Sequence, residues 1–497
     1  MSQINTNVSS LLGQRVLAEQ NRSLNTSLER LSTGLRINRG ADDPAGLIAS
    51  EALRAEEAGI SAAITNAERA EQVVNIAEGG LQEINNLLLG VQSLVGQSAN
   101  EAGLSIEERE ANQLQIDSIL QTIDRISETT SFQGTRLLNG TFDFTVENQA
   151  ATVNDIQVNA ARIPNGETRD VNILVTQSAQ NAGLFLSTGA SLDLSASDAT
   201  LRFDVAGQIG SREFSFASGT AVADIAATIN TFTDITGVSA TASGAGVVLQ
   251  STGLGSNEFV SVEVRDDAGI TGSIVDLSAN DTNALGAAVS SFAAANNPIR
   301  DEGQDIGATI NGVTATTGGA TARISTDFLD VEVDLSTSGA QALGTIAAAT
   351  ITGGGATFNL GPNVDIGNQV SIGIGSVAAR NLGNQINGFL SSLASGQDNN
   401  VVDGDLTAAQ SIVNEAISQI STQRGRLGAF QSNVVGATIR SLGIALENTN
   451  AAESAIRDTD FAAETAELTR SQILVQAATS TLGIANSQPQ SVLSLIG

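Results

Sequence analysis

Apolar residues recur every seven positions near the end of the chain, over residues 453–497. Such a repeat is typical of a helix that packs along another helix. The repeat consists of Phe461, Leu468, Val475 and Leu482, and the apolar tail after it contains Val492, Leu493 and Leu495. The first forty residues carry a matching pattern, which contains Ile4, Val8, Leu11, Leu24, Leu28, Leu31 and Leu35. We predict that the two ends meet, and that the surface formed by these residues of both ends is made for contact with copies of the same chain.

Two longer seven-residue repeats lie inside these ends and predict a second layer of packed helices. The first repeat contains Ile60, Val74, Leu81, Leu88 and Val95, and the second contains Leu406, Val413, Ile420, Leu427 and Val434. A third helix follows the first repeat, with an apolar stripe of Leu114, Leu120, Ile123 and Ile126.

Helix starts are marked by residues whose side chains cap backbone N–H groups. Asp42 or Asp43 is expected to cap the helix after the turn at residues 36–50. Ser105 with Glu108, and Thr407 with Gln410, have the spacing of capping boxes. Polar residues at 447–450 are expected to separate the last two helices.

Between these helical regions the pattern changes to alternating apolar residues, which indicates strands. Residues 171–400 hold 30 of the 50 glycines, and the clearest alternation is at Leu201, Phe203, Val205, Phe214, Phe216, Val331, Val333 and Leu335. One short helix is expected over 220–232, with Thr220 as its cap. The pattern predicts an α+β multidomain fold, in which a paired N- and C-terminal coiled-coil or helical-bundle core carries a strand-rich insertion at its outer tip.

We therefore predict three layers along the chain. The inner core comprises residues 1–44 and 453–497, and the outer helical core comprises 45–170 and 401–452. The insertion comprises 171–400, divided at about residue 300 into two modules.

Composition excludes several functions. The 497 residues include no Cys, His, Trp or Tyr, and the formal net charge is −30, which argues against nucleic acid as a partner. No run of about 18 apolar residues predicts a membrane span, and residues 1–16 lack the pattern of a cleaved signal peptide. We expect either a cytoplasmic protein or an export route that needs no such peptide.

Carboxylates are the remaining candidates for acid–base chemistry or calcium binding, because His, Cys, Tyr and Lys are absent. The closest groups are Asp330 with Glu332 and Asp334, Asp403 with Asp405, and Asp458 with Asp460. Among 53 acidic residues such groups arise by chance, so we interpret them as solvated faces and caps. We expect no enzyme activity, no catalytic residue, no metal site and no cofactor.

Several motifs near both ends resemble those of bacterial flagellins. They are INTNVSSL, SLERLSTGLRINRGADDPAGLIAS and TSFQGTRLLNG near the start, and RGRLGAF, ALENTNAAESAIRDTDFAAETAELTRSQILVQA and QPQSVLSLIG near the end. This resemblance covers roughly residues 1–145 and 404–497, and residues 219–251 resemble more weakly a module that some flagellins carry in the insertion.

The resemblance implies a secreted homopolymer of the flagellar filament, exported unfolded through the flagellar type III apparatus. It further implies contacts with filament cap and hook-junction proteins, and with an export chaperone on the C-terminal helix. Two alternatives remain: a hook–filament junction protein, from which RINRGADDPAG and SQPQSVLSLIG differ, and an adhesin-like binding module on a helical stalk.

One face of the outer helices differs in charge from the corresponding face of the flagellins that the vertebrate Toll-like receptor detects. Where those proteins carry an Arg-rich patch and a Glu, this chain has Gly90, Gln92 and Gln115. We therefore expect weak or absent recognition by that receptor.

Overall fold

The computed structural model describes residues 6–100, 103–164, 167–189, 191–192, 194, 199–244, 246–278 and 281–496. The chain folds into two compact units. The first comprises Met1–Glu71, Asn359–Gln369 and Phe430–Gly497, and the second comprises Gln72–Phe358 and Val370–Ala429. The element order is helices, then strands, then helices, as expected for the α+β fold.

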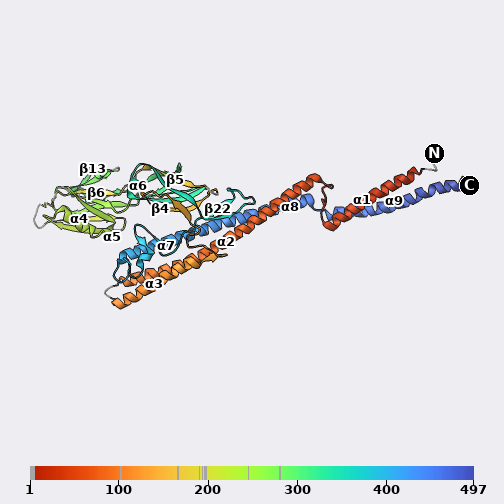
Figure 1. Cartoon of the computed structure of the whole chain (residues 1–497). Coiled ribbons are helices and arrows are strands. Elements are labelled where there is room, and N and C mark those ends of the chain that lie inside the picture. Colours follow the sequence, from red (N-terminus) through yellow and green to blue (C-terminus); the bar gives the residue numbers. More distant parts are fainter. Residues whose placement is uncertain are drawn as a thin grey trace. The chain divides into compact units, whose positions relative to one another are not determined.

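The first unit brings the two ends of the chain together. Its elements are α1 (Val8–Thr33), the first part of α2 (Pro44–Ser98), the π-helix η3 (Phe430–Val435), α8 (Gly436–Arg457) and α9 (Phe461–Ile496). Helices α1 and α9 lie side by side (Figure 1). Backbone bonds fix their register, because Arg36 N donates to Arg457 O at 2.6 Å and Thr459 N donates to Gly34 O at 2.9 Å.

The break before the last helix lies later than the polar cluster at 447–450 suggests. Helix α8 continues through that cluster to Arg457, and α9 begins at Phe461. The Asp460 carboxylate accepts from the backbone N–H groups of Ala462 and Ala463, at 2.9 and 3.1 Å. The Asp460 cap therefore sets the start of α9. The polar residues at 447–450 do not end α8, because polar side chains inside a helix leave its backbone hydrogen bonds intact.

Both aspartates before α2 bind backbone N–H groups. The Asp43 carboxylate accepts from Gly46 N at 2.9 Å, and Pro44 occupies the first turn, where no N–H is needed. The Asp42 carboxylate accepts from the N–H groups of Arg39 and Asn38. These two bonds lower the pKa of Asp42.

The helical part of the second unit consists of the rest of α2, α3 (Ile106–Thr129) and α7 (Leu406–Ala429). The α2 repeat is fully buried, from Ile60 to Val95. Ser105 and Glu108 form the expected capping box of α3. Leu114, however, is 68% exposed, and the buried stripe of α3 instead contains Gln113, Ile116, Leu120, Ile123 and Ser127.

Helix α7 departs from its expected cap. The Asp405 carboxylate accepts from the N–H groups of Thr407 and Ala408, so Asp405 caps the helix instead of Thr407 with Gln410. An Asp directly before the helix satisfies these donors without a capping box.

The seven-residue repeat of α7 shifts by one position at its end. Val413, Ile420 and Leu427 are buried and Leu406 is half-buried. The next buried position is Val435, whereas the expected Val434 is half-buried. The π-helix Phe430–Val435 explains the shift, because its wider turn accommodates one extra residue.

Two pairs of antiparallel sheets form the strand-rich part of the second unit. The first pair has the orders β16-β15-β5-β20-β3 and β17-β18-β19-β4. Both sheets contribute to one apolar core that includes Phe144, Ile173 and Val333. The strands are β3 (Phe144–Glu147), β4 (Val153–Ala161), β5 (Arg169–Gln177), β15 (Gly307–Ile310), β16 (Val313–Thr314), β17 (Thr316–Gly318), β18 (Thr321–Ser325), β19 (Leu329–Leu335) and β20 (Gly344–Gly354), with helix α6 (Thr337–Gln341) between the last two.

The second pair has the orders β13-β12-β6-β10-β9 and β14-β11-β7-β8. Its core contains the alternating residues of β7 and β8, including Phe203 and Phe214. The elements are β6 (Gly183–Ser187), β7 (Thr200–Gly207), β8 (Ser211–Ala217), α4 (Val222–Asn230), α5 (Thr233–Thr236), β9 (Val238–Ser243), β10 (Gly246–Ser251), β11 (Phe259–Asp266), β12 (Ser273–Ser278), β13 (Asp281–Ser291), η1 (Phe292–Ala294) and β14 (Ile299–Glu302).

Each pair of sheets forms one strand module. The second pair, the inner module, is inserted in sequence between strands of the first pair, the outer module. This nesting differs from the expected consecutive modules 171–300 and 301–400. The first core takes strands from both sides of residues 182–302, and β3 and β4 lie before residue 171. Strand pairing between segments far apart in sequence leaves no local signal, so alternation alone placed these boundaries incorrectly.

Helix α4 begins after Ala221, whose side chain makes no capping bond, so Thr220 is not its cap. The Thr220 hydroxyl instead donates to Ala217 O at 2.8 Å. The apolar face of α4 is buried as expected, with Val222, Ile225 and Ile229 in the core.

Short elements connect the strands to the helices. They are β1 (Ser131–Phe132), β2 (Thr135–Arg136), β21 (Ala356–Asn359), β22 (Gln369–Ile372), β23 (Gly383–Asn384), β24 (Gly388–Phe389) and η2 (Leu390–Leu393). Arg426 of α7 donates to the carbonyl oxygens of Asn159 and Gly373, both at 3.3 Å, and so joins the helix to β4. In the described part of the chain, no helix has the length and apolar composition needed to cross a membrane.

Candidate polymerisation surface

The face that α1 turns toward α9 consists largely of small and polar residues. Ser10 and Ser27 of α1 and Ser471 of α9 are buried. A Cβ added to Gly13 would lie 3.1 Å from Leu482 Cδ1, so the glycine permits close approach. Short side chains let two helices approach closely but bury little apolar area, so this pairing is weakly held on its own.

Polar contacts set the register of this pair. The Asn7 side-chain amide donates to Ala485 O at 2.7 Å, and the hydroxyl oxygens of Ser23 and Ser471 are 3.3 Å apart. Arg30 and Glu464 form an ion pair at 3.6 Å. These contacts span most of α1 and permit few alternative alignments.

The outward faces of the same helices carry large apolar residues. On α1, Val8 is 64% exposed and Leu11 is 56% exposed. On α9, Ile473 and Ile484 are also exposed, and their separation of eleven residues places them on one face. Ile473 lies two residues before Val475, which faces α1, so this apolar face points away from α1.

The residues that we predicted for the inner core thus divide into two groups. Leu24, Leu31 and Leu35 of the N-terminal region and Leu468, Val475 and Leu482 of α9 are half-buried. Val8, Leu11, Leu28 and Phe461 are exposed, so within one chain they do not form the pairing face. Ile4 lies outside the described residues, as do the side chains of Val492, Leu493 and Leu495, whose backbone belongs to α9.

The seven-residue repeat missed exposed apolar residues on these helices. They are Leu12, Val16, Ile473, Leu474 and Ile484. On α1 the missed signal is the four-residue spacing from Val8 through Leu12 to Val16, and on α9 it is the eleven-residue spacing from Ile473 to Ile484. Both spacings mark a second apolar face on a helix.

The three expected receptor positions lie on α2 and α3 of the second unit. The Gln92 side-chain amide donates to Asn414 Oδ1 at 2.8 Å, and Gln115 is exposed. A Cβ at Gly90 would lie 3.7 Å from Ile119 Cδ1, an ordinary contact distance, so a Cβ fits there without a clash.

The candidate carboxylates serve the fold. Asp405 and Asp460 cap helices, and the Asp458 carboxylate accepts from the Ser454 hydroxyl at 2.6 Å. Asp330 accepts from Asn159 Nδ2 and Ser325 Oγ. Among the described residues, no group of three or more His, Cys, Asp or Glu side chains is placed to hold a metal ion.

Asp334 is the least favourably placed of these carboxylates. It lies opposite Asp155 in the register of β19 and β4, and Glu332 is two residues away on the same strand. Burial raises the pKa of Asp334, and the charges of Asp155 and Glu332 raise it further, against a hydrogen bond from Asn154. The ionised carboxylate therefore costs stability at neutral pH.

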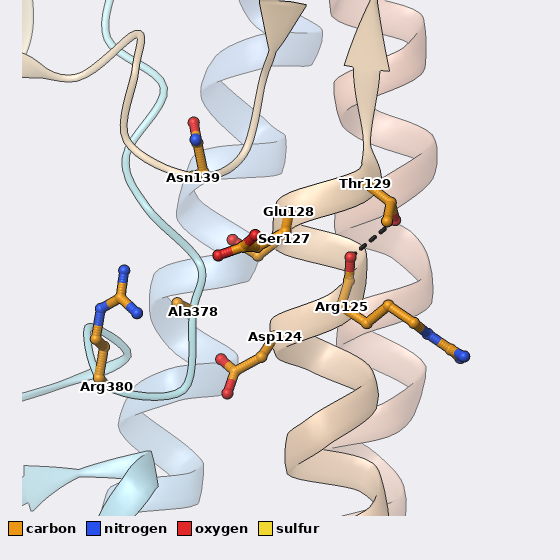
Figure 2. A pocket seen from close by; sticks show the side chains of 8 residues that line it. All are labelled: Asp124, Arg125, Ser127, Glu128, Thr129, Asn139, Ala378 and Arg380. Atoms are coloured by element: carbon orange, nitrogen blue, oxygen red, sulfur yellow. Dashed lines mark hydrogen bonds between the residues drawn. The ribbon is translucent and has the colours of Figure 1, made fainter.

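A polar pocket of about 390 Å³ lies between α3 and the segment that contains Ala378 and Arg380. Figure 2 shows Asp124 and Arg380 on its two walls, with Arg125 directed away. The Asp124 carboxylate accepts from Ala379 N at 2.8 Å, and the Ser127 hydroxyl donates to Leu138 O at 2.8 Å. The bond from Ala379 to Asp124 thus holds the segment against α3.

Comparison with known proteins agrees with this architecture. The profile described as bacterial flagellin N-terminal helical region matches residues 4–143, the C-terminal helical region matches 410–496, and the flagellin hook IN motif matches 200–253. The chain is 31% identical to the B-type flagellin of Pseudomonas aeruginosa, over 99% of each chain. It is 30% identical to the flagellin of Salmonella rubislaw, also over 99% of each.

Among solved structures, FliC from Burkholderia pseudomallei is 14% identical, with a TM-score of 0.25, and the match covers 73% of this chain and 99% of that one.

Paired terminal helices with an uncovered apolar face, combined with a strand-rich insertion, define a structural protein built to assemble. The full-length matches are more specific: the chain belongs to the bacterial flagellins. It is a structural subunit of the flagellar filament, which lies outside the cell. The junction-protein and adhesin alternatives are not favoured, because the full-length relatives are themselves flagellins.

The Ser23–Ser471 contact gives a direct test of the α1–α9 register. In this cysteine-free chain, Ser23→Cys with Ser471→Cys is expected to form an intrachain disulfide, because the two hydroxyl oxygens are 3.3 Å apart. Mild oxidation should remove both free thiols, as measured by thiol labelling and intact mass. Thr26→Cys with Gln472→Cys is the matched control, since both positions are exposed. Equal crosslinking in both variants would contradict the register.

The Asp334 environment predicts a pH-dependent gain in stability. Asp334→Asn removes the like-charge pair of Asp334 on β19 and Asp155 on β4. The free energy of unfolding of the pair of sheets that contains these strands should therefore rise by roughly 0.2–1 kcal/mol at pH 7. The native pKa is raised above 3.8, so the gain should shrink as the pH falls through that raised pKa. Denaturant unfolding at pH 7 and at pH 4 measures the difference. An equal gain at both pH values would exclude the charge as its cause.

Proposed function

We propose that the outward apolar faces of α1 and α9 are the surfaces through which subunits of this chain polymerise. The observation that carries the proposal is the position of Ile473 and Ile484, which are exposed on the face of α9 opposite α1. One partner helix covers one face only, so the second face needs further helices. In a helical lattice of identical subunits, heterologous contacts can cover it without closing a ring.

The same argument supports an assignment of residue ranges to layers of the filament. We propose that residues 1–44 and 453–497 form the inner core and line the filament channel, and that residues 45–170 and 401–452 form the outer core. Strands β3 and β4, which lie in the range 45–170, share an apolar core with strands of the insertion. We propose that the insertion is exposed at the filament surface. Polar residues on α9 outside the apolar faces, such as Gln472 and Thr479, suit a wet channel wall.

Family membership supports a proposal about export and assembly partners. We propose that the subunit passes unfolded through the flagellar type III apparatus, with a chaperone on its C-terminal helix, and meets filament cap and hook-junction proteins. The absence of cysteine from the sequence supports this route, because no disulfide can form before passage. The paired terminal helices gain further stability when neighbours cover their second apolar face. Neither nucleic acid nor membrane is a proposed partner.

We also propose that the subunit has no enzymatic activity and needs no cofactor. The sequence has no His or Cys, and the carboxylates considered above cap helices or bind strand residues. These hydrogen bonds give the carboxylates a structural role in the fold.

Removing the outward apolar face should abolish assembly. Ile473→Ser with Ile484→Ser leaves the α1–α9 contacts in place, yet we expect no elongation of seeded filaments, as in a chain truncated before residue 454. Electron microscopy and sedimentation measure elongation. Ile209→Ser is the control, since Ile209 is equally exposed but lies between β7 and β8. Normal filaments from the double variant or the truncation would refute the proposal.

We propose that the vertebrate Toll-like receptor recognises this chain weakly or not at all. The flagellins that it detects resemble this chain but carry charges where Gly90, Gln92 and Gln115 stand. Loss of these charges removes the charge-assisted hydrogen bonds that such a face can make.

A cell reporter for that receptor should stay silent with wild-type chain at concentrations where other flagellins activate it. The triple variant Gly90→Arg, Gln92→Arg, Gln115→Glu should raise the response, because a Cβ at Gly90 meets no clash and Gln115 is exposed. Filament assembly of the variant serves as the folding control. A full response to the wild-type chain would show that these charges are dispensable.

A further inference from the structure

The loop Asn359–Gln369 runs from the last residue of β21 to the first residue of β22, which Figure 1 labels. It carries the most exposed large apolar side chain among the described residues. Val364 is 83% exposed, and Ile366, two residues later, is 42% exposed. Single exposed apolar side chains are common on protein surfaces, so exposure alone carries little weight. The construction of the loop around them is more informative.

Internal hydrogen bonds hold this loop in one conformation. The Asp365 carboxylate accepts from both the backbone N–H and the side-chain amide of Asn368, at 2.9 and 2.7 Å. The same side-chain amide donates to Asn363 O at 3.1 Å, and Leu360 N donates to Asn368 O at 2.9 Å. The charge between the two apolar residues is therefore used within the loop, and its tip presents an apolar surface.

The loop also rests on a helix of its own compact unit. Pro362 lies so close to Gly59 of α2 that a Cβ on the glycine would be 3.0 Å from Pro362 O and 3.2 Å from Pro362 Cβ. Both residues belong to the unit that contains α1 and α9. The apolar tip is thus fixed in position relative to α2.

A rigid loop with an apolar tip is suited to binding, because little conformational entropy remains to be lost when it docks. The occupant follows from the family: in a filament, the neighbours of each subunit are further copies of the same chain. We propose that the loop Asn359–Gln369 is an intersubunit contact, in which Val364 and Ile366 insert into an apolar site on a neighbouring copy. This inference rests on the proposed polymerisation.

Photocrosslinking identifies the neighbour directly. Val364→Cys supplies the sole thiol of the chain, which a benzophenone maleimide then labels. Illumination of filaments should give covalent dimers, with the crosslinked peptide from a second copy identified by mass spectrometry, whereas unassembled subunits should give none. Ile209→Cys, exposed on the strand module, is the matched control and should give at most a small fraction of the dimer yield.

Val364→Ser with Ile366→Ser measures the contribution of the contact. Loss of two buried apolar side chains should raise the critical concentration for seeded assembly about tenfold or more. Unchanged circular dichroism and thermal unfolding of the monomer would show that the fold is retained. If wild-type subunits elongate seeds, but the double variant has the same critical concentration and the labelled Val364→Cys chain gives no interchain crosslink, the inference is wrong. If wild-type subunits fail to elongate seeds, the proposed polymerisation itself fails.

Discussion

Apolar side chains on opposite faces of α9 are the constraint on which the proposed assembly depends. Leu468, Val475 and Leu482 face α1, while Ile473 and Ile484 point away from it. Burying one such side chain stabilises a structure by roughly 1.5–3 kcal/mol, which is comparable to the entropy lost when a few residues become ordered. The buried seam positions Ser10, Ser27 and Ser471 are small and polar, and the apolar residues beside them are only half-buried, so the helix pair gains stability when its outer face is covered.

The second unit is organised in the opposite way. Each pair of sheets encloses its own apolar core, and α2, α3 and α7 bury a regular stripe. The apolar cores of these parts are buried within the chain itself. The middle of the chain thus buries its own cores, whereas the terminal helices gain stability from association. This combination is expected of a subunit that must remain soluble until it reaches a growing polymer.

Local signals in the sequence predicted much of the helical structure, because a seven-residue repeat and a capping box depend on neighbouring residues. The α2 repeat is buried from Ile60 to Val95, and Ser105 caps α3 with Glu108. The π-helix was not predictable, since one extra residue leaves the apolar composition unchanged and only shifts burial from Val434 to Val435. On α1 the repeat correctly indicated apolar faces but could not tell which face meets α9, and Val8 and Leu11 are exposed within the single chain. The nesting of the strand modules was also beyond local signals, because it depends on pairing between distant segments.

The nesting has a consequence for how such a chain can change its length over evolution. The chain passes from the outer pair of sheets (the core with Ile173 and Val333) to the inner pair (the core with Phe203 and Phe214) near Gln180, and it returns near Gln304. These two residues exchange two backbone hydrogen bonds, at 2.9 and 3.0 Å. The two ends of a segment of more than a hundred residues are thus already adjacent, and a short turn could join them at a small cost in loop entropy. Recombination could remove, replace or duplicate this segment as a cassette without disturbing the register of the strands around it. Surface diversity and filament architecture can then be inherited independently.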